Sequence, residues 1–197
     1  DAIYHEPVMT KQVVAALAVR PGGAYIDCTL GDGGHAVAIL DASDPDGRVL
    51  GIDADPEAIV STSRRLGAFG QRVIITNANF GTVASQAHEN GFVPVDGVLF
   101  DLGLSSRQLD VSERGFSFRR SAPLDMRFNP SGTTAADLVN DLPESQLADT
   151  LYQLGEERRS RRIAKAIVAA RPINDAMELA DVVAKASGYR RGRTHPA

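Results

Sequence analysis

Four short apolar segments, each followed by polar or glycine-rich residues, occupy the first hundred residues of the chain. They cover residues 24–28, 48–52, 73–75 and 95–100, and helix-like stretches separate them. Short apolar strands that alternate with helices typically form a parallel sheet wrapped by helices on both faces. The sequence therefore predicts an α/β fold with the first four strands of a Rossmann-like sheet.

The expected helices have recognisable start signals. Thr10 is predicted to cap a short first helix, and a helix around residues 35–40 follows a glycine-rich turn. Asp55-Pro56-Glu57 combines a cap, a proline at the first helical position and an early acid, which predicts the start of another helix. One more helix is expected near residues 82–89.

The pattern changes after Leu104. Residues 105–133 are rich in Ser, Arg, Gly and Pro, and helices are expected over 134–141, 144–154, 156–171 and 175–187. We therefore expect residues 1–105 to form the first part of a cofactor-binding domain and residues 106–197 to be mostly helical. The pattern alone leaves open whether the helical part is a separate domain or an insertion into the sheet domain.

Composition excludes several classes of protein. The 21 basic against 25 acidic side chains give a net charge of −4, which excludes a wholly polybasic nucleic-acid binder. The single cysteine, Cys28, excludes a disulfide framework and a cysteine-rich zinc site. The four histidines show no metal-ligand spacing, and no apolar run is long enough to cross a bilayer. We expect a cytoplasmic protein without a metal.

Basic side chains gather in two places, although the total charge is negative. One cluster holds Arg158, Arg159, Arg161, Arg162 and Lys165, and the other holds Arg190, Arg191 and Arg193. Such clusters occur on solvated helix faces and on surfaces that contact phosphates. The clusters alone do not choose between these two interpretations.

The segments that follow the predicted strands suggest a ligand site, because ligands of open α/β sheets bind beyond the carboxyl ends of the strands. The first strand ends at Asp27 and leads into glycines that allow a close backbone approach. Asp53 follows the second strand, where an acid can accept both hydroxyls of a ribose. Phe80 and Asp101 follow the third and fourth strands. Two carboxylates, an aromatic ring and a glycine turn suit a nucleoside-containing cofactor.

S-adenosylmethionine suits these residues better than NAD does. The spacing Gly31-x-Gly33-x-x-Ala36 matches the loose dinucleotide pattern, but a lone match is weak. Asp27 suits a cationic ligand, and Asp32 would place a carboxylate in a turn meant to hold pyrophosphate. His35, at the start of a helix, is expected to contact the cofactor or the backbone rather than to act as a base.

The chain resembles the MraW-type methyltransferases, which methylate the N4 amine of a cytidine in small-subunit (16S) ribosomal RNA. The resemblance runs from His5 to the last residue. Its motifs include Asp27-Cys28-Thr29-Leu30-Gly31-Asp32-Gly33-Gly34-His35, Asp101-Leu102-Gly103-Leu104-Ser105-Ser106, Glu113-Arg114-Gly115-Phe116-Ser117-Phe118 and Pro123-Leu124-Asp125-Met126-Arg127. The stretch 101–127 is specific to this family.

The resemblance implies S-adenosylmethionine as cofactor, with contacts at Gly33, Gly34, His35, Asp53, Phe80, Asp101 and Gln108. It also implies that the helical region is an insertion concerned with RNA, with small-subunit ribosomal RNA or the assembling 30S subunit as partner. No membrane partner is expected, and a homo-oligomer is an option. Relatives continue beyond the His195-Pro196-Ala197 segment, so low activity is expected of the chain by itself.

The N4 amine of cytosine is a poor nucleophile, so an enzyme has to position it and offset the positive charge that develops during attack. Asp101, Ser105 and Ser106 are the expected groups for this role. The arginines then become phosphate contacts, with Arg158, Arg159, Arg161, Arg162, Arg190 and Arg191 as the expected set. Two alternatives stay open: a non-catalytic RNA-binding or assembly protein, and a methyltransferase for a small molecule or a protein.

Overall fold

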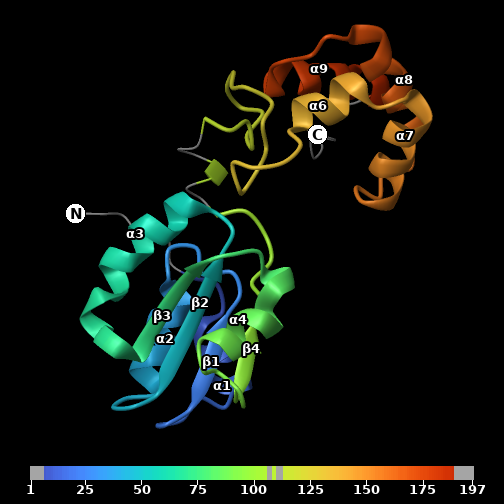
Figure 1. Cartoon of the computed structure of the whole chain (residues 1–197). Coiled ribbons are helices and arrows are strands. Elements are labelled where there is room, and N and C mark those ends of the chain that lie inside the picture. The colour runs from blue at the N-terminus through green and yellow to red at the C-terminus, as the bar shows by residue number, and fades with distance from the viewer. Residues whose placement is uncertain (1–6, 106–107, 110–112, 189–197) are drawn as a thin grey trace. The chain divides into compact units, whose positions relative to one another are not determined.

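The computed structural model of the chain describes residues 7–105, 108–109 and 113–188. The chain divides into two compact units, Asp1–Ser105 and Ser106–Ala197, which we call the sheet unit and the helical unit (Figure 1). Each unit has a hydrophobic core of its own.

The sheet unit contains four parallel strands: β1 (Ala24–Asp27), β2 (Arg48–Asp53), β3 (Val73–Asn77) and β4 (Gly97–Leu99). Their spatial order is β3-β2-β1-β4, with Ile26 paired to Leu50 on one side and to Val98 on the other. This is how a doubly wound Rossmann-like sheet begins, and the order reverses between β1 and β4. The α/β prediction is confirmed.

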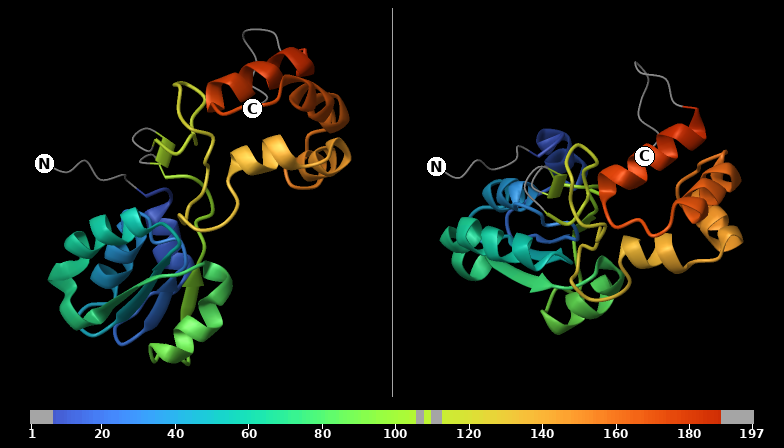
Figure 2. Two further views of the ribbon diagram at one scale, coloured as in Figure 1. Left: turned by 45° about the horizontal axis from the view of Figure 1, so that its top comes forward. Right: turned by 90° about the horizontal axis from the view of Figure 1, so that it is seen from above.

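Helices cover both faces of the sheet (Figures 1 and 2). The helices α1 (Thr10–Ala16), α2 (Gly34–Ala42) and α3 (Pro56–Leu66) precede or follow the first two strands, and α4 (Val83–Glu89) follows β3. Tyr25 packs with Leu40 of α2 and Leu66 of α3. The neighbouring Ile26 packs with Phe92, which follows α4 in the chain. Alternate residues of a strand point to opposite faces, so β1 is buried on both.

The start signals were partly correct. Asp55 caps α3, since its side chain accepts a 3.0 Å hydrogen bond from the N–H of Glu57. The prediction that Thr10 caps the first helix is wrong, because α1 begins at Thr10 and Met9 precedes it with a left-handed backbone at φ 52°. The Thr10 hydroxyl instead donates to the carbonyl oxygen of Pro7. Two short 3₁₀ segments, η1 (Gly67–Arg72) and η2 (Phe80–Thr82), flank β3.

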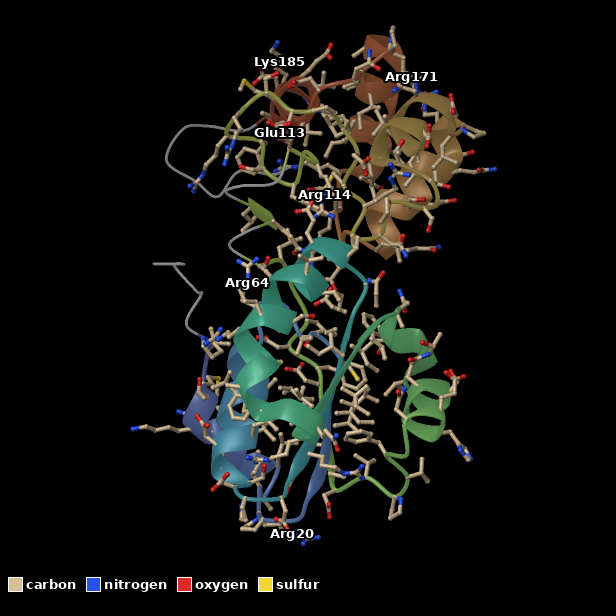
Figure 3. All side chains as sticks on the ribbon, turned by 60° about the vertical axis from the view of Figure 1, so that its left-hand side comes forward. Arg20, Arg64, Glu113, Arg114, Arg171 and Lys185 are labelled. Atoms are coloured by element: carbon tan, nitrogen blue, oxygen red, sulfur yellow. The ribbon has the colours of Figure 1, made fainter. Side chains whose placement is uncertain are left out.

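The helical unit contains α6 (Ala135–Asp141), α7 (Glu144–Gln153), α8 (Ser160–Ala170) and α9 (Ala176–Ser187). The large apolar side chains of its core come from all four helices, from the connection between α8 and α9 and from the segment before α6: Leu124, Val139, Leu147, Ile163, Ile167, Ile173 and Val183. Arg171 donates to the carbonyl oxygens of Val139 and Leu142, and so ties the end of α8 to the end of α6 (Figure 3). None of the helices that the structure describes has the length and apolarity needed to cross a bilayer.

The third predicted helix of this region begins later than expected. It was predicted over 156–171, but α8 starts at Ser160, and Glu156 has a left-handed backbone with φ 52°. A left-handed residue interrupts a right-handed helix, so the residues before Ser160 form turns. Arg158 therefore lies in a turn before α8, whereas Arg162 lies on the helix.

Candidate functional site

Three acidic side chains follow strands of the sheet at its carboxyl edge. Asp27 is the last residue of β1, Asp53 is the last residue of β2, and Asp101 follows β4. The charges of Asp53 and Asp101 both raise the pKa of Asp27, which shows that the three carboxyl groups lie near one another. Parallel strands bring their carboxyl ends to the same edge, so residues far apart in the chain form one acidic site.

The glycine turn between β1 and α2 is held by side chains from α3. The Thr62 hydroxyl donates a hydrogen bond to the carbonyl oxygen of Gly31, and the Arg65 guanidinium donates one of 2.7 Å to the carbonyl oxygen of Asp32. Gly33 has φ 76°, and a Cβ atom built on it would lie 2.6 Å from the Thr62 methyl group. Only glycine fits this turn without strain, and its backbone is fixed before any ligand arrives.

Asp53 connects this turn to the end of β2. Its Oδ2 accepts a 2.7 Å hydrogen bond from the N–H of Gly31, and its Oδ1 accepts one of 2.8 Å from the N–H of Asp55. Burial raises the pKa of Asp53 above its ordinary value, and the bonds from Asp55 and Gly31 oppose that shift. Each oxygen keeps a second lone pair, so the carboxylate is fixed in place and can still accept a hydroxyl.

His35 and Asp101 form the closest pair of ionisable groups at this edge. Nε2 of His35, whose side chain is 6% exposed, lies 3.3 Å from Oδ2 of Asp101, whose side chain is 46% exposed. The backbone N–H of Asp101 donates a 2.7 Å hydrogen bond to the Thr29 hydroxyl oxygen, which fixes the chain after β4 against the end of β1. Both ring nitrogens of His35 are buried and lack a well-aligned hydrogen bond. The pair thus presents one exposed carboxylate with a buried imidazole behind it.

Asp27 is the most deeply buried acid of the site, with an exposed fraction of 1%. Oδ1 accepts a 3.1 Å hydrogen bond from the N–H of Thr29, while Oδ2 is buried without a hydrogen-bond partner. Burial, reinforced by the charges of Asp53 and Asp101, raises the pKa of Asp27 to about 7. Burial and the charge of Asp27 raise the pKa of the neighbouring Cys28 to about 11, so this thiol is a core group and not a nucleophile.

Two exposed aromatic rings stand at the ends of β3 and β4. Phe80 and Phe100 are 43% and 45% exposed, and their rings meet edge to face with centroids 5.8 Å apart. Because each ring is partly exposed, it can offer an apolar face or edge to a heterocyclic base. The sequence had suggested Phe80 but not Phe100, whose only signal is its position directly before Asp101.

The structure brings together most of the predicted cofactor residues. Gly33, Gly34, His35, Asp53, Phe80 and Asp101 all belong to the sheet unit, at or beside the carboxyl ends of its strands. Gln108 is buried and belongs to the helical unit. Ser105 is half-buried at the end of the sheet unit, and Ser106 lies outside the described residues. In the ranges 7–105, 108–109 and 113–188 no three His, Cys, Asp or Glu side chains are grouped as metal ligands.

The predicted RNA-binding arginines are exposed around the start of α8. Arg161 and Arg162 lie in its first turn, and Arg158 lies in the turn before it. Arg159 is also exposed, but its guanidinium donates to the carbonyl oxygen of Ser187 at the end of α9. Arg190 and Arg191 lie outside the described residues.

The aromatic residues of the segment before α6 are divided between packing and exposure. Phe116 is buried against Phe128, with ring centroids 5.2 Å apart, and Arg114 lies over the Phe116 ring at 5.7 Å. Phe118 and Phe128 are 38% and 40% exposed. Phe116 and Phe128 thus pack against each other within the helical unit, and Phe128 keeps part of its ring exposed.

The chain has well-defined relatives. It is 51% identical over 194 residues to a ribosomal RNA small subunit methyltransferase H from Dehalococcoides mccartyi, which covers 98% of the chain and 56% of that protein. It is 50% identical over 202 residues to the protein of the same name from Syntrophobacter fumaroxidans, and 50% identical over 197 residues to that from Thermomicrobium roseum. Those matches cover 100% and 98% of the chain, but only 63% and 60% of the relatives.

The chain therefore spans less than two thirds of the length of these relatives. Residues 2–197 match the model of the MraW methylase family, which is nearly the whole chain. Two of the motifs on which the resemblance was based, at the ends of β1 and β4, contribute Asp27 and Asp101 to the acidic site. The chain belongs to the MraW methylase family.

Proposed function

We propose that the chain binds S-adenosylmethionine at the carboxyl edge of its sheet and takes part in methylating the N4 amine of a cytidine in small-subunit ribosomal RNA. The observation that carries the proposal is the acidic site itself. It combines a rigid glycine turn, three carboxyl groups and an exposed aromatic pair, on a chain that belongs to a methylase family. When bound, the cofactor supplies the methyl group as an already activated sulfonium.

The residues of the site fit such a cofactor on physical grounds. Asp53 is held rigidly by two backbone hydrogen bonds and has lone pairs left for ribose hydroxyls. Phe80 and Phe100 present the apolar surface that an adenine ring needs. The buried Oδ2 of Asp27 lacks a partner, and a cationic ligand nearby compensates such a group. The pyrophosphate of NAD would instead bring negative charge next to these acids.

Asp101 is the proposed group that faces the target base. Its carboxylate is the most exposed of the three and has His35 beside it, and its backbone N–H donates to the Thr29 hydroxyl oxygen. A carboxylate in this position offsets the positive charge that develops on N4 as the amine attacks. Ser105 lies a few residues further along the same segment, and we propose that its hydroxyl helps to orient the amine.

The helical unit is the proposed RNA-binding part. Arg158, Arg161 and Arg162 gather where the positive end of the α8 helix dipole lies, so the positive charge there is concentrated. Within the protein this arrangement is unfavourable, and a phosphate bound there relieves it. We propose that this surface contacts the backbone of the ribosomal RNA, in the cytoplasm where ribosomal subunits assemble.

Methyl transfer provides the direct test. The chain is incubated with tritiated S-adenosylmethionine and 30S subunits from a strain that lacks this modification, and the nucleosides are separated by chromatography. We expect label in N4-methylcytidine, and none with an Asp101→Ala variant that still binds the cofactor. Label in protein, or in a nucleoside other than cytidine, would contradict the proposal.

Because the chain is shorter than its relatives, cofactor binding is measured separately by calorimetry. We expect heat with S-adenosylmethionine and none with NAD. Binding of RNA without binding of S-adenosylmethionine would favour a non-catalytic RNA-binding protein instead.

A further inference from the structure

Asp27 occupies an environment that disfavours a charged carboxylate. It is 1% exposed, its Oδ2 has no hydrogen-bond partner, and its Oδ1 accepts a hydrogen bond from the Thr29 backbone N–H. Hydrogen bonds from the Thr29 backbone and side chain lower the pKa of Asp27, but burial outweighs them. Among the described residues, the charges that act on Asp27 add to the cost of a negative charge there. Asp53 and Asp101 are acids that repel it, and Cys28 beside it is held as a neutral thiol.

His35, from α2, lies at this edge and is paired with Asp101. Its Nε2 lies 3.3 Å from Oδ2 of that residue. Arg65, from α3, donates to the carbonyl oxygen of Asp32. The site therefore contains three carboxyl groups around a position where a cation is favoured, and the most buried of the three has the greatest need of one.

We propose that the Asp27 carboxyl group holds a proton in the ligand-free site and releases it to solvent when the cationic cofactor binds. The ligand-free protein has a neutral carboxylic acid at this position, and the complex has a carboxylate close to the positive cofactor. One O–H bond of the acid is broken, and the proton leaves to the buffer. This inference rests on the proposed function, because the ligand is the proposed cofactor.

The same linkage separates the methyl donor from its product. S-adenosylmethionine carries a sulfonium and an ammonium, whereas S-adenosylhomocysteine has lost the sulfonium charge after transfer. The product therefore stabilises the Asp27 carboxylate less and allows it to take back its proton. The inferred role of Asp27 is that of a positioning residue, which favours the charged donor over the neutral product without touching the methyl group.

The first experiment tests whether Asp27 holds a proton in the ligand-free chain. The carboxyl carbons of the aspartates are followed by NMR across the pH range, for the wild type and for Asp27→Asn. We expect one carboxyl group that titrates near pH 7, consistent with the raised pKa, and we expect it to be missing in the variant. Asparagine has the size of the neutral acid and keeps an oxygen for the Thr29 N–H, so the variant should fold. If every aspartate carboxyl group titrated in the ordinary acidic range, the inference would be overturned.

The release is tested by calorimetry of the chain with S-adenosylmethionine and S-adenosylhomocysteine, in two buffers of different ionisation enthalpy. At a pH just below the midpoint of Asp27, the wild type should release a larger fraction of a proton with S-adenosylmethionine than with S-adenosylhomocysteine. At pH values below that midpoint, each unit of increase in pH should raise the affinity for the donor by up to about tenfold. The Asp27→Asn variant should show neither effect.

A matched control removes a carboxylate from the adjacent turn. Asp32→Asn should leave the proton release unchanged. Equal release with both ligands, or release that persists in Asp27→Asn, would overturn the inference while leaving the cofactor assignment intact. If neither ligand binds, the cofactor part of the proposed function fails, and the NMR titration still decides whether Asp27 holds a proton.

Discussion

The backbone N–H of Gly31 donates a 2.7 Å hydrogen bond to Oδ2 of Asp53, so the end of β2 directly supports the turn that follows β1. Asp53 therefore has two tasks, since its carboxylate holds the turn and is the proposed acceptor for ribose hydroxyls. A substitution at this position affects both.

Replacing Asp53 with alanine should weaken the binding of S-adenosylmethionine by roughly 1–3 kcal/mol, because the N–H of Gly31 and the ligand hydroxyls lose their acceptor. Asp53→Asn keeps one carbonyl oxygen and should lose less. Circular dichroism checks that both variants fold, and calorimetry gives the affinities. Wild-type affinity in Asp53→Ala would remove Asp53 from the proposed site.

Replacing Thr62 with valine tests the support of the glycine turn from α3. The variant keeps the shape of the side chain but loses the hydroxyl that donates to the carbonyl oxygen of Gly31. We expect the free energy of unfolding to fall by about 1 kcal/mol and cofactor affinity to fall with it.

Ser61→Ala is the control, because the Ser61 hydroxyl donates to the Ala58 carbonyl oxygen within the same helix. That variant should leave cofactor affinity unchanged. Urea denaturation and calorimetry provide the two measurements, and equal affinities in the two variants would show that the turn does not depend on Thr62.

Reversing charge at the start of α8 tests the RNA surface. Arg158→Glu combined with Arg162→Glu should weaken RNA binding and flatten its dependence on salt. With fewer phosphate contacts, RNA binding releases fewer counterions. Filter binding over a range of salt concentrations measures both quantities, and cofactor affinity should not change.

A double variant of the sheet unit matches the change in net charge. Lys11→Glu and Arg64→Glu alter exposed side chains on α1 and α3, and Figure 3 shows Arg64 on the sheet unit. If this pair weakens RNA binding as strongly as the α8 pair, the effect reflects total charge rather than a specific surface.

Stability should depend on pH in an unusual direction because of Asp27. Its pKa is about 7 in the folded chain against 3.8 as the ordinary value, so the folded state holds more protons between these limits. The free energy of unfolding should therefore fall as the pH rises from about 4 to about 7, and change little above that. In Asp27→Asn this contribution should disappear, which denaturation at a series of pH values would show. A parallel pH profile in the variant would contradict the assignment.

The outer edge of β4 should promote self-association. In the part of the chain that the structure describes, β4 pairs only with β1, and Val98 is 38% exposed. Unpaired strand edges with apolar side chains pair with other chains, so we expect dimers or larger species at rising concentration in sedimentation experiments. Val98→Lys should reduce them, whereas Val60→Lys, at an exposed position on α3, should not.

Much of the site could be predicted because the sheet is parallel. Asp27, Asp53 and Asp101 each follow an apolar run, and parallel strands necessarily bring such positions to one edge. The supports from α3 could not be predicted. Thr62 and Arg65 contact a turn about thirty residues earlier in the chain, and nothing in their local sequence signals that contact.

The start of α8 was misjudged for a different reason. Glu and Arg favour helices, so residues 156–159 read as helical in the sequence. Glu156 instead has a left-handed backbone, which its residue type does not signal. Phe100 was missed because an aromatic residue at a strand end is also typical of an ordinary core.

The core of the helical unit is built entirely from side chains between Leu124 and Ala186, while those of the sheet unit lie between Leu17 and Leu99. Substitutions in one core therefore do not disturb the packing of the other. Over evolutionary time the two units can therefore vary at different rates, so that the proposed RNA-binding surface can change while the proposed cofactor site is kept. Exchanging the helical unit between relatives is accordingly a way to make hybrid proteins in which the two proposed roles are tested separately.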